Sequence, residues 1–325
     1  MMQMKDVFQR YSDDITRVEA CMDVHLRSEV SLIPKIIQHL VGSGGKRFRP
    51  LLLLICSDLC GYRGGKCYTL SAVIEFIHTA TLLHDDVIDQ AQTRRGKISA
   101  NNVWGNAASV LVGDFLYSKA FKLMADDDNL DVIRLISATT NVMSEGEVLQ
   151  LVKCGDTDIT EAEYLTIIEK KTSILMSAAC ASGAILGGAA PPQIDALARF
   201  GLRLGSAFQI TDDTLDYTAL EEEFGKNIGK DLEEGKMTLP LIHTLKHCSP
   251  SERDRIRTII ESGGADGSAV REIVEIINRY DGISAALTRA EAYINEAKAS
   301  LDIFEDCEAR TALLTIADFV VERRL

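Results

Sequence analysis

The chain has 325 residues, of which 48 are acidic and 35 are basic, so its formal net charge is −13. With 46% hydrophobic and 26% charged residues, it has the composition of a soluble globular protein with a large core. The acidic balance argues against a nucleic-acid-binding surface, which requires a basic face, and the aromatic content of 6% argues against stacking on single strands.

The N-terminal residues 1–20 mix acidic and basic side chains and contain no apolar core of the kind that a secretion signal has. The eight cysteines are scattered without a Cys-x-x-Cys pair, which is typical of reduced thiols. Both features predict a cytoplasmic protein.

Apolar residues recur at helical spacing along almost the whole chain, as between Val132 and Leu151, and alternating strand patterns are absent. Prolines fall mostly where a helix could begin or end, and glycine clusters at 42–45, 61–65 and 262–264 predict loops. We therefore expect one all-α domain over residues 1–325, a single large helical bundle of roughly ten or more helices.

The first candidate anion site is the segment Gly-Gly-Lys-Arg-Phe-Arg-Pro at 44–50. It places Lys46, Arg47 and Arg49 where a loop enters a predicted helix. Backbone amides, the helix N-terminus and guanidinium groups all favour an anion there.

The second feature is the cluster Asp85-Asp86-Val87-Ile88-Asp89, which follows an apolar helical segment. On a helix, Asp85 and Asp89 share one face and repel each other. Mg²⁺ relieves such repulsion through oxygen ligands while it retains waters and phosphate oxygens. The alternative for a single such cluster is a solvated acidic helix face. Further bases, at Arg94, Arg95 and Lys97, follow the cluster.

The uncharged stretch from Thr172 to Ile194 contains Gly183-x-x-x-Gly187, a spacing also used by packed membrane helices. Most of the stretch consists of small residues, and Pro191-Pro192 follow near its end. A buried helix with small-residue contacts is favoured over a membrane span.

The cluster Asp212-Asp213-Thr214-Leu215-Asp216 repeats the spacing of the first cluster and also follows an apolar run. Two matched clusters facing one another would hold several Mg²⁺ ions around a diphosphate, and the metals would stabilise charge on departing pyrophosphate. This repetition makes a purely solvated acidic face improbable. By contrast, Asp126–Asp128 and Glu221–Glu223 lack such framing and are interpreted as solvated helix ends. The pair His243 and His247 has no supporting carboxylate for a zinc site.

Together these segments resemble trans-isoprenyl diphosphate synthases (polyprenyl synthetases) along essentially the whole chain. The segments that carry the resemblance are Gly-Gly-Lys-Arg-Phe-Arg-Pro at 44–50, Leu-Leu-His-Asp-Asp-Val-Ile-Asp at 82–89, Arg-Arg-Gly at 94–96, Gly-Asn-Ala-Ala-Ser-Val-Leu-Val-Gly-Asp-Phe at 105–115, Glu-Gly-Glu at 145–147, Phe-Gln-Ile-Thr-Asp-Asp-Thr-Leu-Asp at 208–216, Gly-Lys-Asn at 225–227 and Gly-Lys-Met-Thr-Leu-Pro at 235–240.

The resemblance implies an isoprenoid synthase-type bundle around a deep central cavity, usually in a homodimer. It also implies that Asp85, Asp89 and Asp212 ligate Mg²⁺ on the allylic diphosphate, with support from Asp86, Asp213 and Asp216. The implied isopentenyl diphosphate-binding residues are Lys46, Arg49, His78 and Arg95. Those implied for the allylic diphosphate, with farnesyl diphosphate as the expected primer, are Arg94, Lys171, Lys226 and Lys236.

The implied reaction is ionisation of the allylic diphosphate, attack by isopentenyl diphosphate and loss of a proton, with Thr172 and Gln209 beside the allylic cation. Product length should depend on how deep the chain can extend. Ala80 and Thr81, before Asp85, are small and leave the path open, and Met124 and Ile136 are candidate floor residues or ordinary core residues.

The resemblance implies octaprenyl diphosphate as the product, for a quinone side chain. Shorter farnesyl or geranylgeranyl products and longer solanesyl or decaprenyl products remain alternatives. Two other classes are a non-catalytic partner subunit of a heteromeric synthase and a terpene cyclase. The two intact aspartate clusters count against both.

Overall fold

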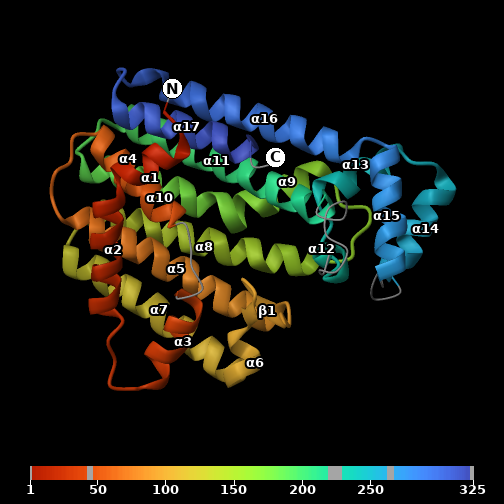
Figure 1. The fold of residues 1–325 in the computed structure, drawn as a ribbon, viewed down its shortest axis with the longest axis horizontal. Coiled ribbons are helices and arrows are strands. Elements are labelled where there is room, and N and C mark those ends of the chain that lie inside the picture. The colour runs from red at the N-terminus through yellow and green to blue at the C-terminus, as the bar shows by residue number, and fades with distance from the viewer. Residues whose placement is uncertain (1, 42–46, 219–228, 262–266, 323–325) are drawn as a thin grey trace. The chain divides into compact units, whose positions relative to one another are not determined.

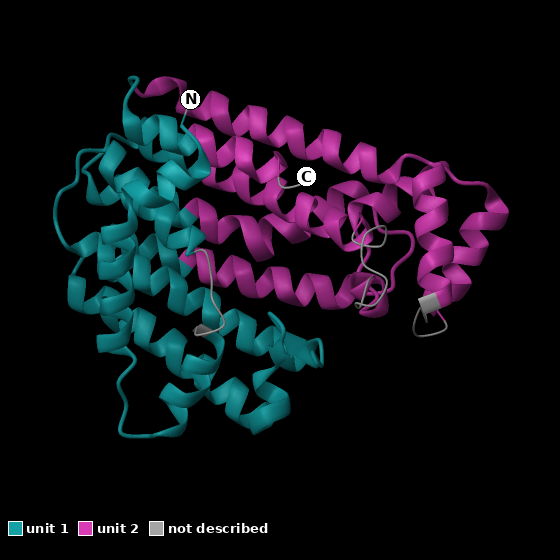
Figure 2. Ribbon diagram, in the orientation of Figure 1, with its two compact units in different colours: residues 1–137, 178–198, 305–313 teal, residues 138–177, 199–304, 314–325 magenta. Residues whose placement is uncertain are grey.

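The structure is a computed structural model that describes residues 2–41, 47–218, 229–261 and 267–322. Its regular structure is almost entirely helical, which confirms the predicted all-α class (Figure 1). The described residues divide into two compact units (Figure 2). Unit 1 comprises residues 1–137, 178–198 and 305–313, and unit 2 comprises residues 138–177, 199–304 and 314–325. The single domain expected over residues 1–325 stays a prediction.

The elements that lie wholly in unit 1 are α1 (Met4–Arg10), α2 (Ser12–His25), α3 (Leu32–Val41), α4 (Phe48–Leu59), α5 (Lys66–Ile88), β1 (Thr93–Arg94), β2 (Lys97–Ile98), α6 (Ala100–Trp104) and α7 (Asn106–Asp127). Those of unit 2 are α9 (Glu161–Ile168), η1 (Glu169–Ser173), α12 (Lys230–Glu233), α13 (Leu239–His247), α14 (Pro250–Glu261), α15 (Gly267–Arg279), α16 (Gly282–Ser300) and η2 (Leu301–Ile303). The remaining helices have residues in both units: α8 (Leu130–Lys153), α10 (Ile174–Leu186), α11 (Pro191–Thr218) and α17 (Glu308–Glu322).

Helix α5 forms the centre of unit 1, where it packs against α2, α4 and α7. Every residue from Leu70 to Ile77 is buried, and this continuous run covers all sides of the helix. A helix that is apolar on several sides is enclosed by its neighbours. The C-terminal end of this helix carries the first aspartate cluster, which is therefore held on a rigid element.

The stretch with the Gly183-x-x-x-Gly187 spacing is a packed helix of the protein interior. A Cβ atom on Gly183 would lie 2.5 Å from the carbonyl oxygen of Leu53, and one on Gly187 would lie 2.3 Å from Cβ of Cys60. The two glycines thus let α10 approach α4 closely, as the buried-helix interpretation predicted. Among the described residues, no helix is long and apolar enough to cross a membrane.

Prolines also lie as predicted, since Pro191 and Pro250 are the first residues of α11 and α14 and Pro240 is the second residue of α13. The helix α10 ends at Leu186, so Pro191 begins a new helix rather than ending the previous one. The predicted glycine loop at 61–65 separates α4 from α5, whereas the loops predicted at 42–45 and 262–264 lie outside the described residues.

One element was missed by the sequence analysis, the antiparallel hairpin of β1 and β2, in which Arg94 pairs with Lys97. The two residues between the strands, Arg95 and Gly96, have φ angles of 51° and 76°. Two positive φ values in a two-residue loop are typical of a type I′ turn. Strands of two residues are too short to show an alternating pattern, which is why the sequence did not reveal them.

Candidate active site

The first aspartate cluster lies at the C-terminal end of α5. The amide of Asp89 donates a hydrogen bond of 2.7 Å to the carbonyl oxygen of Asp85, so one helical turn joins the two residues. Both side chains are half-buried, whereas Asp86 between them is 0% exposed. The predicted sharing of one face by Asp85 and Asp89 is confirmed, and these two carboxylates are accessible to a cation.

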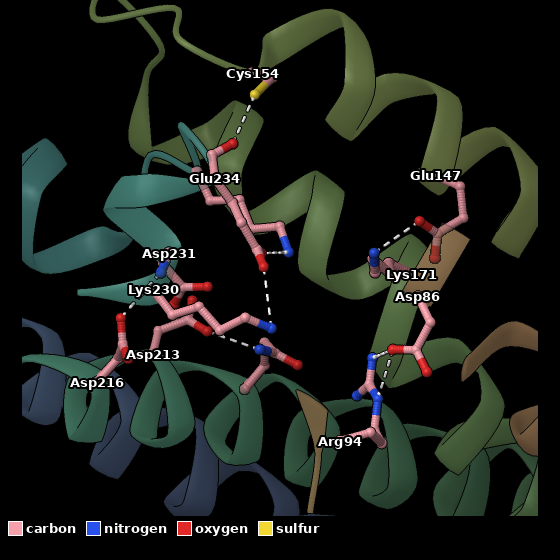
Figure 3. Close-up of polar contacts among 12 residues, drawn as sticks. Asp86, Arg94, Glu147, Cys154, Lys171, Asp213, Asp216, Lys230, Asp231 and Glu234 are labelled. Carbon is pink, nitrogen blue, oxygen red and sulfur yellow. Dashed lines mark hydrogen bonds and ion pairs between the residues drawn. The ribbon is translucent and has the colours of Figure 1, made fainter. Parts of the chain in front are cut away.

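Asp86 is turned inward and binds an arginine. Arg94 of β1 donates hydrogen bonds of 2.8 Å from Nε and 2.6 Å from Nη2 to the same oxygen, Oδ1 of Asp86 (Figure 3). The other oxygen, Oδ2, is buried and has no hydrogen-bond partner among the described residues. Asp86 therefore fixes Arg94 beside the aspartate cluster.

A small cavity in unit 1 gathers the basic residues near this cluster. It is lined by Leu40, Arg47, Glu75, His78, Thr79, Leu82, Arg94 and Arg95. The side chain of Arg49 is half-buried, and its Nε atom is buried without a hydrogen-bond partner among the described residues. Lys46 lies outside the described residues. An unpartnered buried guanidinium nitrogen beside further cations is suited to an anionic ligand.

His78 contributes a neutral ring to this cavity. Burial lowers its pKa well below the usual value, and the neighbouring guanidinium groups, with that of Arg49 first, lower it further. A neutral imidazole can hydrogen-bond to a substrate without adding to the repulsion among the arginines.

Arg47 is held by carboxylates, an arrangement that the sequence did not reveal. Its guanidinium lies 3.1 Å from Oε1 of Glu75 and 3.3 Å from Oε1 of Glu19. Arg47 has a left-handed backbone with φ of 44° at the N-terminus of α4. A non-glycine residue keeps a left-handed backbone only where the surrounding structure holds it, and at Arg47 the two ion pairs hold the side chain.

The second aspartate cluster lies near the C-terminal end of α11, in unit 2. Asp212 is exposed, and Asp213 is buried. Asp213 accepts hydrogen bonds of 2.6 Å from the hydroxyl of Tyr164 and 2.7 Å from Nε2 of Gln209. Burial raises the pKa of Asp213 to about 6, while these two hydrogen bonds oppose the rise. Asp212 is thus the accessible carboxylate, and Asp213 is anchored in the interior.

Gln209 extends this network to the π-helical turn η1, because its Oε1 accepts a hydrogen bond of 3.0 Å from the hydroxyl of Thr172. Lys171, also on η1, lies 2.7 Å from Oε2 of Glu147 on α8 (Figure 3). Gly146 permits this approach, since a Cβ atom there would lie 2.8 Å from the backbone nitrogen of Lys171. A π-helical segment often marks a functional site.

Asp216 and Asp231 add two further carboxylates in unit 2. The amide of Asp231 donates a hydrogen bond of 3.1 Å to Oδ2 of Asp216 (Figure 3). Burial, followed by repulsion from Asp213 and Asp216, raises the pKa of Asp231 well above its usual value. A divalent cation would relieve this crowding of acidic groups, so the donors fit a hard metal ion.

Lys236, another predicted site residue, lies 2.5 Å from Oε2 of Glu234. Lys226 and the Glu221–Glu223 run lie outside the described residues. The sequence analysis assigned no role to Tyr164, Asp231 or Glu147. Only Glu147 had a signal, as part of the Glu-Gly-Glu segment, while the other two are brought to the site by the fold.

The four predicted chain-length residues all lie in unit 1. Ala80 is fully buried on α5, and Thr81 beside it donates a hydrogen bond to the carbonyl oxygen of His78. Met124 and Ile136 are buried on α7 and α8. Their role in product length stays a prediction.

Other candidate metal clusters find no support in the described part of the chain. No group of three or more His, Cys, Asp or Glu side chains is already arranged there around a common metal position. The ring centroids of His243 and His247 lie 4.3 Å apart, with the two ring planes tilted by 33°. Asp126 and Asp128 are exposed at the end of α7, as predicted for a solvated helix end. Asp127 departs from that prediction, because its side chain is only 10% exposed and its Oδ1 lies 3.2 Å from Nζ of Lys66.

Comparisons with known proteins agree with these features. The family model described as polyprenyl synthetase matches residues 30–277. The octaprenyl diphosphate synthase of Escherichia coli (strain K12) is 42% identical over 322 residues, which are 99% of each chain.

Two solved structures are similar over nearly the whole chain. A polyprenyl synthase from Caulobacter crescentus CB15, complexed with calcium and isoprenyl diphosphate, has a TM-score of 0.95 and 39% identity, covering 99% of this chain and 98% of that one. A decaprenyl diphosphate synthase from Rhodobacter capsulatus has a TM-score of 0.94 and 39% identity, covering 98% and 99%. The chain therefore belongs to the polyprenyl synthetase family of prenyltransferases.

Proposed function

We propose that this chain elongates an allylic diphosphate by successive condensations with isopentenyl diphosphate and releases an all-trans octaprenyl diphosphate. The observation that carries this proposal is that both aspartate clusters are intact and end helices beside cationic side chains. The product length is supported by the similarity to the octaprenyl diphosphate synthase of Escherichia coli.

Mg²⁺ is the proposed cofactor, with Asp85 and Asp89 as ligands in the first cluster and Asp212 in the second. Asp85 and Asp89 are half-buried and Asp212 is exposed, whereas Asp86 and Asp213 are buried and hold neighbouring side chains. Bound Mg²⁺ supplies positive charge that stabilises the departing pyrophosphate.

The substrate diphosphates bind to two sets of side chains in this proposal. Isopentenyl diphosphate binds to Lys46, Arg49, His78 and Arg95. The diphosphate of the allylic primer, farnesyl diphosphate, binds to Arg94, Lys171, Lys226 and Lys236. Guanidinium groups suit this task because they donate paired hydrogen bonds to phosphate oxygens.

The carbocation formed on ionisation needs stabilisation and protection from water. The hydroxyl of Thr172 and the amide oxygen of Gln209 present partial negative charge to it, and the Gln209–Asp213 hydrogen bond orients this amide. The π electrons of isopentenyl diphosphate form the new carbon–carbon bond. Released pyrophosphate accepts the proton, so no side chain is assigned as base.

A homodimer is the proposed assembly. On α7 of unit 1, Leu111 is 66% exposed beside exposed Val110, and on the part of α8 in unit 2, Val148, Leu151 and Val152 are exposed. Exposed apolar groups on one helix are typical of a protein–protein interface. Leu111→Asp should shift the protein to monomers in sedimentation velocity, and an unchanged mass would contradict this assignment.

The enzymatic proposal is tested with Asp85→Asn and Asp212→Asn, each assayed with farnesyl and isopentenyl diphosphates at saturating Mg²⁺. Each variant should lose most condensation activity, on the order of a hundredfold or more, because a ligand that stabilises transition-state charge is removed. Near-normal turnover in both variants would contradict the two-cluster mechanism.

A further inference from the structure

The turn that follows α12 contains a carboxylate bound by two lysines. Glu234 lies 3.0 Å from Nζ of Lys230 and 2.5 Å from Nζ of Lys236, and its side chain is only 14% exposed (Figure 3). Two ammonium groups that share one carboxylate could equally share the oxygens of another anion, such as a diphosphate.

The backbone of this turn is fixed from the C-terminal end of α8. The thiol of Cys154 donates to the carbonyl oxygen of Glu234 at 3.0 Å (Figure 3). The amide of Gly155 donates to the carbonyl oxygen of Gly235 at 2.8 Å. The amide of Lys236 in turn donates to the carbonyl oxygen of Asp231 at 2.7 Å. With the backbone held, the long lysine side chains can change partner while the turn stays in place.

The surroundings of this ion-pair cluster are acidic. The carboxylates of Asp213, Asp216 and Asp231 are close enough to be attracted by Lys230 or Lys236. Asp216 and Asp231 are also repelled by Glu234. An anion that enters here is attracted by the two lysines and by any cations that it brings with it, and it must compete with Glu234 for the lysines.

We infer that Glu234 is an internal competitor of the substrate diphosphate, and that Lys230 and Lys236 exchange its carboxylate for diphosphate oxygens when substrate binds. Lys230 thereby becomes a further diphosphate-binding residue. The exchange costs little net hydrogen bonding, because each ammonium group trades one oxyanion for another. The same competition weakens the hold on product pyrophosphate and favours its release after each condensation.

This inference rests on the proposed function in taking a diphosphate as the ligand. The test uses inorganic pyrophosphate and the full chain in Mg²⁺ buffer, with binding measured by isothermal titration calorimetry and no prenyl substrate present. Failure of prenyl condensation is scored in a separate assay, so it cannot be mistaken for failure of the exchange.

The decisive variant is Glu234→Gln. Glu233→Gln is its matched control, since Glu233 is the exposed last residue of α12, next to Glu234, and the charge change is identical. Glu234→Gln should lower the Kd for pyrophosphate about tenfold, because the neutral amide no longer competes with pyrophosphate for the lysines. A tenfold change corresponds to about one charge-assisted hydrogen bond. Glu233→Gln should leave it unchanged. Weaker binding by Glu234→Gln, or binding equal to that of Glu233→Gln, would overturn the inference.

The lysine is tested by Lys230→Met against Lys246→Met, which removes the same charge from an exposed position on α13. Lys230→Met should raise the Kd about tenfold, again the effect of one charge-assisted hydrogen bond. An equal Kd in the two lysine variants would show that Lys230 does not bind diphosphate. Circular dichroism on all four variants confirms that the helices are retained.

Discussion

Arg94 and Asp86 are joined by two hydrogen bonds to a single carboxylate oxygen, and this pair ties the β1–β2 hairpin to the end of α5. The pair explains why adjacent aspartates of one cluster have different environments. Asp86 is fully buried and pairs with a cation of the protein, whereas Asp85 is half-buried.

We expect this difference to separate stability from activity. Asp86→Asn should reduce the free energy of unfolding by about 1.5–3 kcal/mol, since buried hydrogen bonds to a charged group are lost. Asp85→Asn, at a more exposed position, should change it by less than about 0.5 kcal/mol. Urea unfolding of both variants measures this. Equal stability of the two variants would show that the Arg94–Asp86 pair contributes nothing.

Tyr164 should anchor the second cluster through its hydroxyl. Tyr164→Phe leaves Oδ2 of the buried Asp213 without its donor, so the free energy of unfolding should fall by about 1.5–3 kcal/mol. Tyr280→Phe is the matched control, because it also removes a hydrogen bond to a carboxylate, that of Glu252, at a more exposed position. Tyr280→Phe should lower the free energy of unfolding by less than Tyr164→Phe does. If urea unfolding ranks the two variants in the opposite order, the anchoring role of Tyr164 is contradicted.

The close approach of α10 to α4 predicts that Gly183 does not tolerate a side chain. Gly183→Ala should destabilise the protein by about 1–3 kcal/mol, because its Cβ atom would meet the carbonyl oxygen of Leu53 at 2.5 Å. Ser182→Ala is a control on the same helix, since it removes a buried hydroxyl that has no hydrogen-bond partner among the described residues. Thermal unfolding should show a lower Tm for Gly183→Ala only. Alanine has a higher helix propensity than glycine, so a raised Tm of Gly183→Ala would contradict the close packing at this position.

Ala80→Phe tests the proposed path of the growing chain. Ala80 is fully buried one turn before Asp85, so a ring there should fill the path and shorten the main product by several isoprene units. Ala80→Ser adds little volume and should keep the product length. Product sizing by chromatography distinguishes the two, and an unchanged product from a folded Ala80→Phe protein would place the path elsewhere.

Much of the site could be predicted from sequence because the decisive signals are local. The spacing of Asp85 and Asp89 is one helical turn, and this alone indicated their common face. The glycine spacing on α10 likewise indicated close packing, although the partner helix α4 could not be named. Helical periodicity and the positions of proline together predicted the all-α class.

The remaining contacts join residues that are distant in the chain. Asp213 and its donor Tyr164 are 49 positions apart, and no spacing rule links them. The hairpin that places Arg94 depends on a left-handed Arg95, a conformation that few residue types favour and that arginine does not signal. Such contacts are created by the packing of helices and become visible only in the folded chain.

Synthesis of octaprenyl diphosphate can be measured by incubating the purified chain with farnesyl diphosphate, isopentenyl diphosphate and Mg²⁺ and sizing the prenyl products after dephosphorylation. All-trans octaprenol should be the main product, and it should disappear when a chelator replaces Mg²⁺. A cyclic hydrocarbon, or no elongation by the purified chain at saturating Mg²⁺, would contradict the proposed function.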